Sequence, residues 1–238
     1  MLNKKIQIKS PPLNEIAYQK IKEFIVTLKL EPGEQVDEER LAKLLSIGRT
    51  PIREALFRLK AEKLVEVLPS RGFFVREITL SSLKDLFETM LILERSAVAL
   101  AARRIGPDRI EILQKINNDL QRAWRARNFL KVTLLNSHFH RTIYQATENS
   151  FLFSYLDNLQ YQAQRLAYMC FSKDLSAYDL ESHAQLAIND HQSLIDLFRQ
   201  GEDLQAVKVI SEHVKLFQRR VNHFLLPALD TINHAAQL

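Results

Sequence analysis

The chain has 238 residues, of which 46% are hydrophobic, and its formal net charge is +5 at pH 7. The single cysteine, Cys170, excludes a disulfide framework. No run of about 18 apolar residues predicts a membrane span, and no signal-peptide pattern opens the chain. We therefore expect a cytoplasmic protein that makes no membrane contact, and this length suits two domains.

The positive charge is concentrated in the first third of the chain. Residues 1–78 contain 15 Lys and Arg against 11 Asp and Glu, whereas residues 79–238 contain 18 against 17. An excess of this kind on a small domain is typical of a phosphate-binding surface. We expect residues 1–12, which include three lysines, to form a flexible basic arm. Such an arm either adds salt-sensitive affinity for nucleic acid or merely solubilises the chain.

Two helices are predicted first. Residues 13–28 carry apolar side chains at a helical period, and a turn signal at Glu31–Glu34 follows them. Asp37 then has the character of an N-cap for a short helix over Glu38–Leu45.

The next segment, from Gly48 to Leu56, has the pattern of a recognition helix. Pro51 suits the first helical position, and Thr50 before it can act as the cap. Arg49 and Arg53 are four residues apart and would project from one face, where guanidinium groups can bind phosphates or read guanine. Two solvated arginines are the usual alternative for such a pair.

A β-hairpin with a basic tip completes this part of the chain. Val65–Leu68 and Phe73–Arg76 are predicted strands, and Pro69–Gly72 between them contains turn residues. Three helices and a hairpin predict a winged helix-turn-helix over residues 13–77. A module of this size leaves little room for a catalytic cleft.

The remainder is predicted to be an all-α bundle. Residues 78–82 form the expected linker, with a hinge near Glu77–Ser82, residues 83–230 the bundle, and residues 231–238 a C-terminal tail. About six helical patterns occur there, from Leu83 to the stop at Gly106-Pro107 and then over Asp108–Arg127, Phe129–Glu148, Phe151–Phe171, Tyr178–Gln200 and Leu204–Phe224. The expected fold class is therefore mainly α.

All seven histidines lie in this bundle. Asn136 and His140 are one helical turn apart, and His191 and His213 lie on two helices that the turn at Gly201 folds together. Three imidazoles and an amide oxygen can converge on one cation. By spacing alone this signal is weak, because each histidine is more often a core or surface residue.

The N-terminal part resembles the DNA-binding domain of GntR-family bacterial transcription regulators. The resemblance rests on Pro32-Gly33, Leu41-Ala42, Arg49 to Leu56, Leu64-Val65 and Arg71 to Val75. It implies a regulator rather than an enzyme, with no catalytic residues, which binds a near-palindromic double-stranded DNA operator as a homodimer. The implied DNA contacts are Arg40, Arg49, Thr50, Arg53, Arg71 and Gly72. Two residues depart from the family pattern: Gly48 replaces Ser or Thr, and Lys63 replaces Gly.

The bundle resembles the FadR-type ligand-binding domain, or FCD domain, of the same family. The resemblance is carried by Asp85-Leu86, Leu93-Glu94, Ala99–Ala102, Asn136–His140, Asn149 with Leu152, His191 and Glu212-His213. It implies a divalent metal such as Zn, Ni or Mn on Asn136, His140, His191 and His213. A small organic acid would complete the site as effector, and His138, His223 and His234 would not be ligands.

Two departures concern the effector pocket, for which the candidates are Met90, Glu94 and Arg165. Asn136 stands where Asp is more usual, so the metal site loses one negative charge. Met90, four residues before Glu94, stands where many relatives carry an arginine that pairs with the effector. Arg165 is a candidate replacement, with a solvated surface arginine as its alternative. A less acidic or more apolar effector, or no effector, also remains open.

The resulting hypothesis is a repressor whose operator affinity is controlled by a metabolite. Two alternatives stay open: a metal-dependent helical-bundle enzyme with an appended DNA-binding domain, and an architectural DNA-binding dimer without effector. Asp190 and Glu212 neighbour metal-ligand candidates in sequence, and we expect them to be surface charges or partners of the ligands.

Overall fold

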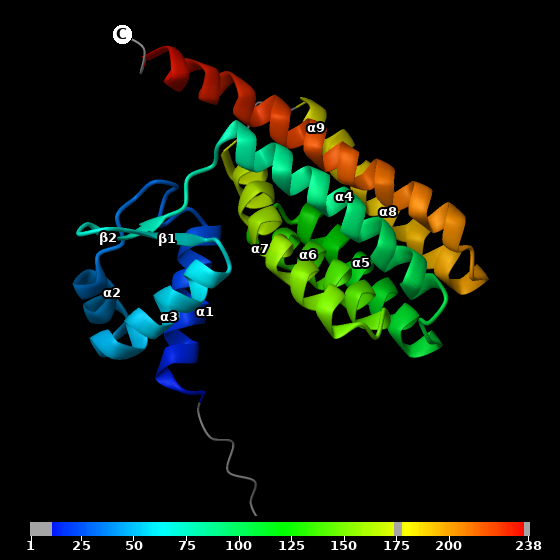
Figure 1. Ribbon diagram of the computed structural model, residues 1–238. Coiled ribbons are helices and arrows are strands. Elements are labelled where there is room, and N and C mark those ends of the chain that lie inside the picture. Colours follow the sequence, from blue (N-terminus) through cyan, green and yellow to red (C-terminus); the bar gives the residue numbers. More distant parts are fainter. Residues whose placement is uncertain (1–10, 174–177, 236–238) are drawn as a thin grey trace, which may run out of the picture. The chain divides into compact units, whose positions relative to one another are not determined.

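The computed structural model describes residues 11–173 and 178–235, and the chain divides into two units at Glu77 and Ile78 (Figure 1). The first unit contains α1 (Leu13–Val26), α2 (Glu38–Leu45), α3 (Arg49–Ala61), β1 (Val65–Leu68) and β2 (Gly72–Val75). The second contains α4 (Leu80–Ala102), α5 (Pro107–Arg125), α6 (Phe129–Ala146), α7 (Ser150–Lys173), α8 (Tyr178–Gln200) and α9 (Asp203–Ala235). The predicted fold class is confirmed.

Helix α3 packs against α1 through the stripe that the sequence predicts. Ala55, Leu56 and Leu59 are buried, as is Ile52. On α1 the buried residues follow the same helical period and are Ala17, Tyr18, Ile21, Ile25 and Val26. Because the apolar face of α3 is turned inward, its Arg49 and Arg53 side chains are exposed.

The start of α3 differs from the prediction. The helix begins at Arg49 with Gly48 as its N-cap, and no side chain caps it. Pro51 is therefore the third helical residue, and Thr50 lies inside the first turn and does not act as the cap. Proline is tolerated here because the N–H groups of the first turn have no partner within the helix.

The hairpin is antiparallel, with Val65 opposite Val75 and Leu68 opposite Gly72. Gly72 has a φ of +88°, a conformation that other residues adopt only under strain. Next to β2, the backbone N–H of Val36 donates to the carbonyl of Phe73 over 2.8 Å, and Gln35 Nε2 donates to the carbonyl of Arg71 over 2.7 Å. The tip of the wing is thus fixed to the turn that precedes α2.

The turn after α3 contains a strained lysine. Lys63 has a φ of +58°, and the N–H of Leu64 donates to the carbonyl of Leu59, which closes a Schellman turn. Glycine is the residue that this position favours, and a side chain in the left-handed region costs about 1–2 kcal/mol.

We expect Lys63→Gly to raise the free energy of unfolding by about 1 kcal/mol, because glycine removes this strain at a modest entropic cost. Urea unfolding followed by far-UV circular dichroism measures the change. Lys60→Gly, in the last turn of α3, is the control and should instead lower stability by about 1 kcal/mol. A loss of stability in Lys63→Gly would show that the lysine side chain outweighs the strain.

The connection between the units is shorter than the expected linker over residues 78–82. Helix α4 begins at Leu80, because Thr79 and Ser82 form a reciprocal capping box. The residues between β2 and α4 are therefore 76–79. At the other end, α9 continues to Ala235, past the predicted start of the tail at residue 231. The predicted basic arm over residues 1–12 lies outside the described residues, except for Pro11 and Pro12.

The six helices of the second unit lie side by side (Figure 1). Helix α4 packs on α9, α5 packs on α6 and α8, and α6 packs on α7. Gly201, with a φ of +71°, reverses the chain between α8 and α9, so these helices pack against each other as predicted. No described helix is long and apolar enough to cross a membrane.

Candidate DNA-binding surface and metal site

A recess of about 640 Å³ lies between the start of α2, the start of α3 and the wing. Five of the six predicted DNA contacts line it: Arg49, Thr50, Arg53, Arg71 and Gly72. Residues from three separate elements therefore meet on one concave surface, which we call the arginine recess. Arg40 is exposed but does not line the recess, so its contact with DNA remains a prediction from the resemblance alone.

Asp37 positions the acidic side of the recess. It is the N-cap of α2, as predicted, and its Oδ1 accepts from the backbone N–H groups of Glu39 and Arg40 over 2.9 and 3.0 Å. Glu38 and Glu39 follow in the first turn. Glu39 pairs with Arg49, and Glu38 Oε2 lies 3.5 Å from Arg53 Nε.

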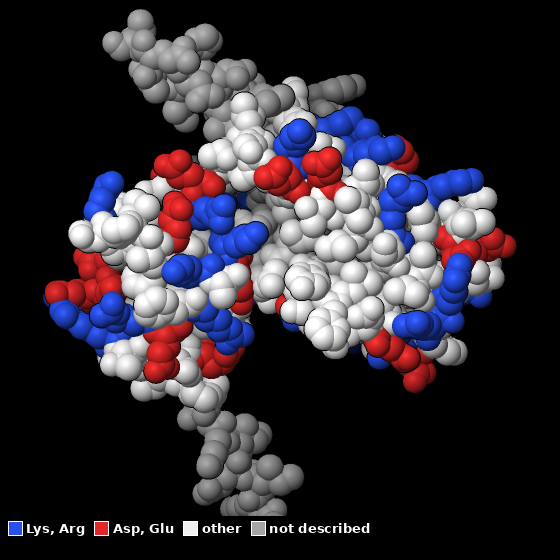
Figure 2. Space-filling view, in the orientation of Figure 1, with Lys and Arg blue, Asp and Glu red and all other residues white. Residues whose placement is uncertain are grey.

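These ion pairs hold the arginine side chains at the recess, but they contribute little free energy and are easily broken. Both arginines are more than half exposed, and exposed pairs contribute only about 0–1 kcal/mol. Figure 2 accordingly shows blue and red side chains interspersed on the visible face of the first unit. Phosphate oxygens can therefore replace the carboxylates of Glu38 and Glu39 readily.

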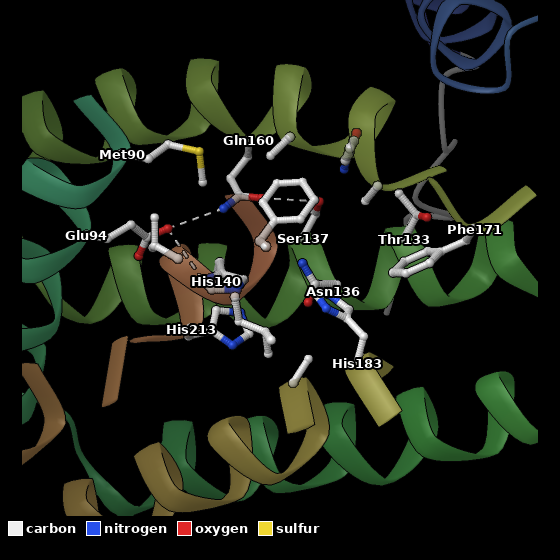
Figure 3. A pocket seen from close by; sticks show the side chains of 17 residues that line it. Met90, Glu94, Thr133, Asn136, Ser137, His140, Gln160, Phe171, His183 and His213 are labelled. Atoms are coloured by element: carbon white, nitrogen blue, oxygen red, sulfur yellow. Dashed lines mark hydrogen bonds and ion pairs between the residues drawn. The ribbon is translucent and has the colours of Figure 1, made fainter. Parts of the chain in front are cut away.

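The second unit encloses a cavity of about 50 Å³ between α4, α6, α7, α8 and α9 (Figure 3). We call it the bundle cavity. Its lining includes Met90, Glu94, Asn136, His140 and His213, all of them candidates from the sequence. At roughly 10–15 Å³ for each water, this is room for a few waters or a compact ligand.

Three histidines meet at one end of the bundle cavity. His140 of α6, His191 of α8 and His213 of α9 are all buried, and their ligand nitrogens lie within 4.8 Å of one another. The ring of His191 stacks on Phe139 at 4.0 Å between centroids. Asn136 lies one turn before His140 and lines the same cavity. The structure thus brings the three predicted histidine ligands together, and Asn136 lines the cavity beside them.

The electrostatic environment suits neutral imidazoles. Burial lowers the pKa of His191 well below its ordinary value, and the neighbouring His213 and His140 lower it further. Among the described residues neither ring nitrogen of His191 has a hydrogen-bond partner. Buried nitrogens without a partner are unfavourable, and a divalent metal would bind one of the two in the neutral form of the ring.

Carboxylates lie beside the other two imidazoles. Asp190 Oδ2 is 3.3 Å from His213 Nδ1, and Glu94 Oε1 is 3.5 Å from His140 Nδ1, the latter without hydrogen-bond geometry. Such partners fix ring orientation in metal sites and leave Nε2 for the metal. The expected role of Asp190 as a ligand's partner agrees with this contact, whereas Glu212 is exposed and pairs with Lys215.

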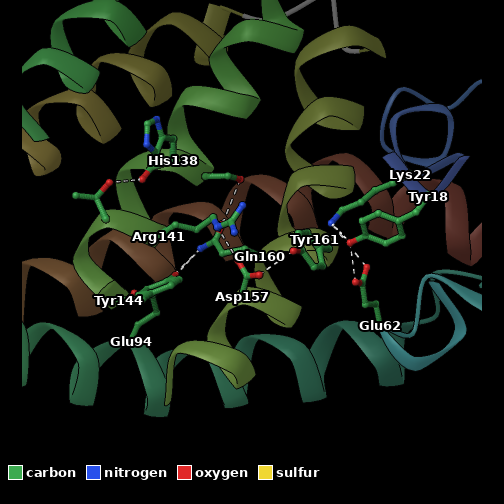
Figure 4. Close-up of polar contacts among 12 residues, drawn as sticks. Tyr18, Lys22, Glu62, Glu94, His138, Arg141, Tyr144, Asp157, Gln160 and Tyr161 are labelled. Carbon is green, nitrogen blue, oxygen red and sulfur yellow. Dashed lines mark hydrogen bonds and ion pairs between the residues drawn. The ribbon is translucent and has the colours of Figure 1, made fainter. Parts of the chain in front are cut away.

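Glu94 itself is only 1% exposed. Tyr144 donates to its Oε1, and Gln160 Nε2 donates to the Tyr144 hydroxyl over 2.6 Å (Figure 4). Burial and the Glu94 carboxylate raise the pKa of Tyr144 well above its ordinary value. The tyrosine therefore stays protonated and keeps donating to Glu94.

Family models match both units. Residues 13–75 match the model described as "Bacterial regulatory proteins, gntR family", and residues 85–216 match the FCD domain. The chain belongs to the GntR family of regulators with an FCD domain. This confirms the resemblance inferred from the residues, and GntR-family regulators bind DNA.

The relatives of this GntR-family chain are transcriptional regulators and not enzymes. The Nta operon transcriptional regulator of Aminobacter aminovorans is 35% identical over 126 residues, which cover 52% of this chain and 59% of that relative. The transcriptional repressor RspR of Escherichia coli is 20% identical over 204 residues, 86% of each chain. The solved structure of E. coli McbR/YncC has a TM-score of 0.76 at 22% identity and covers 88% of this chain and 99% of its own, which shows a shared fold.

In this GntR-family chain, Arg165 is neither a residue of the cavity wall that could contact an effector nor a solvated surface arginine. It is buried, with 3% exposure, and does not line the bundle cavity. Gln160, Gln164 and Ala167 of α7 face the cavity, and residue 165 is rotated about 100° from Gln164, so its side chain leaves in another direction.

The other histidines whose side chains the structure describes lie outside the cluster formed by His140, His191 and His213. His138 and His223 are exposed and stand outside the cluster, as expected for residues that are not ligands, and the side chain of His234 lies outside the described residues. Sequence reasoning missed His183, which is buried and lines the bundle cavity together with Gln160. His183 lies two helical turns before His191 on α8, so the helical spacing places both on one face of that helix, and this is the signal that reveals it.

Proposed function

We propose that this GntR-family protein is a cytoplasmic transcriptional repressor whose operator affinity is controlled by a small ligand at a divalent metal. One observation carries the proposal: three buried imidazoles from three helices meet beside an enclosed cavity, in a chain with a separate DNA-binding unit. A repressor role is also in keeping with the name of the relative RspR.

The arginine recess would engage the operator. Arg49 and Arg53 at the start of α3 would enter the major groove, where they would exchange Glu39 and Glu38 for phosphate or guanine. Arg71 and Gly72 at the wing tip would face the minor groove. Thr50 can donate its hydroxyl to a phosphate from the same helix end.

Asn136, His140, His191 and His213 would hold the metal, for which Zn, Ni or Mn is suited. When bound, the metal supplies a positive centre with open positions for a donor atom of the effector. No lysine or arginine is among the described residues that line the bundle cavity. A small organic acid, the effector class implied by the resemblance, would thus depend on the metal alone for its positive partner.

A homodimer would place two recognition helices on the half-sites of a near-palindromic operator. Large apolar side chains are available for such pairing on α4 and α7. Ile92 is 62% exposed on α4, and Phe151 and Tyr155 are 77% and 64% exposed on α7. In Figure 2 the middle of the visible face of the second unit is an area without charged side chains, and charged side chains lie along its upper and right-hand edges. Effector binding would shift the arrangement of the two DNA-binding units about residues 76–79.

The proposal is tested on DNA sequences that the purified protein selects from a random pool. Fluorescence anisotropy then gives the dissociation constant of the metal-loaded protein, with and without members of a panel of small acids and uncharged chelators. We expect one class to change the constant about 5- to 150-fold, the range of a coupling free energy of 1–3 kcal/mol. If neither the metal nor any ligand changes the dissociation constant, the result would favour an architectural DNA-binding dimer without effector.

A further inference from the structure

Glu94 places a negative charge at the wall of the bundle cavity. The side chain lies on α4 beside Met90, is almost fully buried and lines the cavity (Figure 3). A buried carboxylate is costly unless positive charge or hydrogen-bond donors surround it. The described lining residues include no lysine or arginine, so donors must supply this stabilisation.

The surrounding hydrogen bonds run toward Oε1 of the carboxylate, whereas its Oε2 is buried without a hydrogen-bond partner among the described residues. Ser137 Oγ donates to Gln160 Oε1 over 3.4 Å, Gln160 Nε2 donates to the Tyr144 hydroxyl over 2.6 Å, and Tyr144 donates to Glu94 Oε1. Gln160 Nε2 also lies 3.4 Å from Glu94 Oε1. Each donor in this series of hydrogen bonds points its positive end toward Glu94. This is the arrangement that stabilises an anion.

The charges around the three histidines complete the argument. Glu94 faces His140, and the partly exposed Asp190 faces His213, so two carboxylates adjoin the imidazoles from outside the ligand set. Asn136 contributes no charge. Two negative charges therefore balance a divalent metal before any effector arrives.

We propose that the bundle cavity accepts an uncharged donor ligand at the metal, and that Glu94 excludes anions such as carboxylates. This inference rests on the proposed metal site. An incoming carboxylate would meet Glu94 across a small buried cavity whose described lining holds no lysine or arginine to offset the repulsion. A neutral nitrogen or oxygen donor of compact size meets no such penalty, and Ser137 and Gln160 offer it polar contacts.

The test uses the full-length protein loaded with Co²⁺, whose visible absorption reports ligand exchange at the metal. Imidazole at pH 8 is the neutral probe and acetate is the anionic probe. We expect the acetate affinity relative to imidazole to rise at least tenfold in Glu94→Gln, which keeps the size and removes the charge. Glu88→Gln, an exposed carboxylate on the same helix, is the matched control and should leave the ratio unchanged.

A second variant tests the exclusion of anions by adding a positive charge instead of removing the negative one. Met90→Arg places a guanidinium one turn before Glu94 and should also raise the relative acetate affinity at least tenfold. Circular dichroism and the cobalt content verify that each variant is folded and loaded. An unchanged ratio in every loaded variant would overturn the inference while leaving the metal site intact. Failure of the parent protein to bind Co²⁺, Zn²⁺ or Ni²⁺ would overturn the metal site and the inference with it.

Discussion

Arg53→Ala is expected to weaken binding to pool-selected DNA about 5- to 150-fold and to relax the preference at one base position, a loss of about 1–3 kcal/mol. The side chain projects from the first turns of α3 into the arginine recess, where its exposed partner Glu38 is easily displaced. A guanidinium in that place can donate twice to the O6 and N7 atoms of guanine. Truncation removes both bonds at once.

Anisotropy titrations with selected and with random DNA of equal length measure this effect. Lys60→Ala is the matched control, because it removes one positive charge from the exposed surface at the other end of α3. We expect this variant to weaken binding to both DNAs slightly and equally. If Arg53→Ala also weakened binding to both DNAs equally, Arg53 would contact a phosphate and would not read a base.

His191→Leu is expected to abolish metal binding while leaving the metal-free protein at least as stable as the parent. Both nitrogens of His191 are buried without a partner, and an unsatisfied buried polar group costs about 1–3 kcal/mol. Leucine fills a similar volume, although it loses the stacking on Phe139. We expect the free energy of unfolding of the metal-free protein to rise by about 1 kcal/mol.

Plasma mass spectrometry of the purified protein and urea unfolding after chelation separate the two effects. His138→Leu removes an exposed histidine on α6 and should retain the metal. Asp190→Asn should weaken metal binding about 10- to 100-fold without abolishing it, because it disturbs only the partner of His213. A strongly destabilised, metal-free His191→Leu protein would instead assign His191 to the packing of the core.

Local patterns and family motifs were sufficient to predict most of the elements and the residue types of both sites. Periodicity predicts a helix because it depends on neighbours three and four residues away, and this located the apolar stripe of α3 and the α6 face that carries Asn136 and His140. The turn at Gly201 was readable for the same reason, since a short glycine turn reverses the chain. The family motifs then named His191 and His213 as partners of His140.

Only the tertiary structure decided which of those side chains meet. The cap of α3 is Gly48 because the helix begins two residues earlier than the proline rule suggests. Arg165 and Gln164 are adjacent in sequence, but the rotation of α7 turns only Gln164 to the bundle cavity. The pairing of Glu39 with Arg49, and the donors that converge on Glu94, join separate elements. Such contacts depend on how each helix is rotated and packed, which no local pattern specifies.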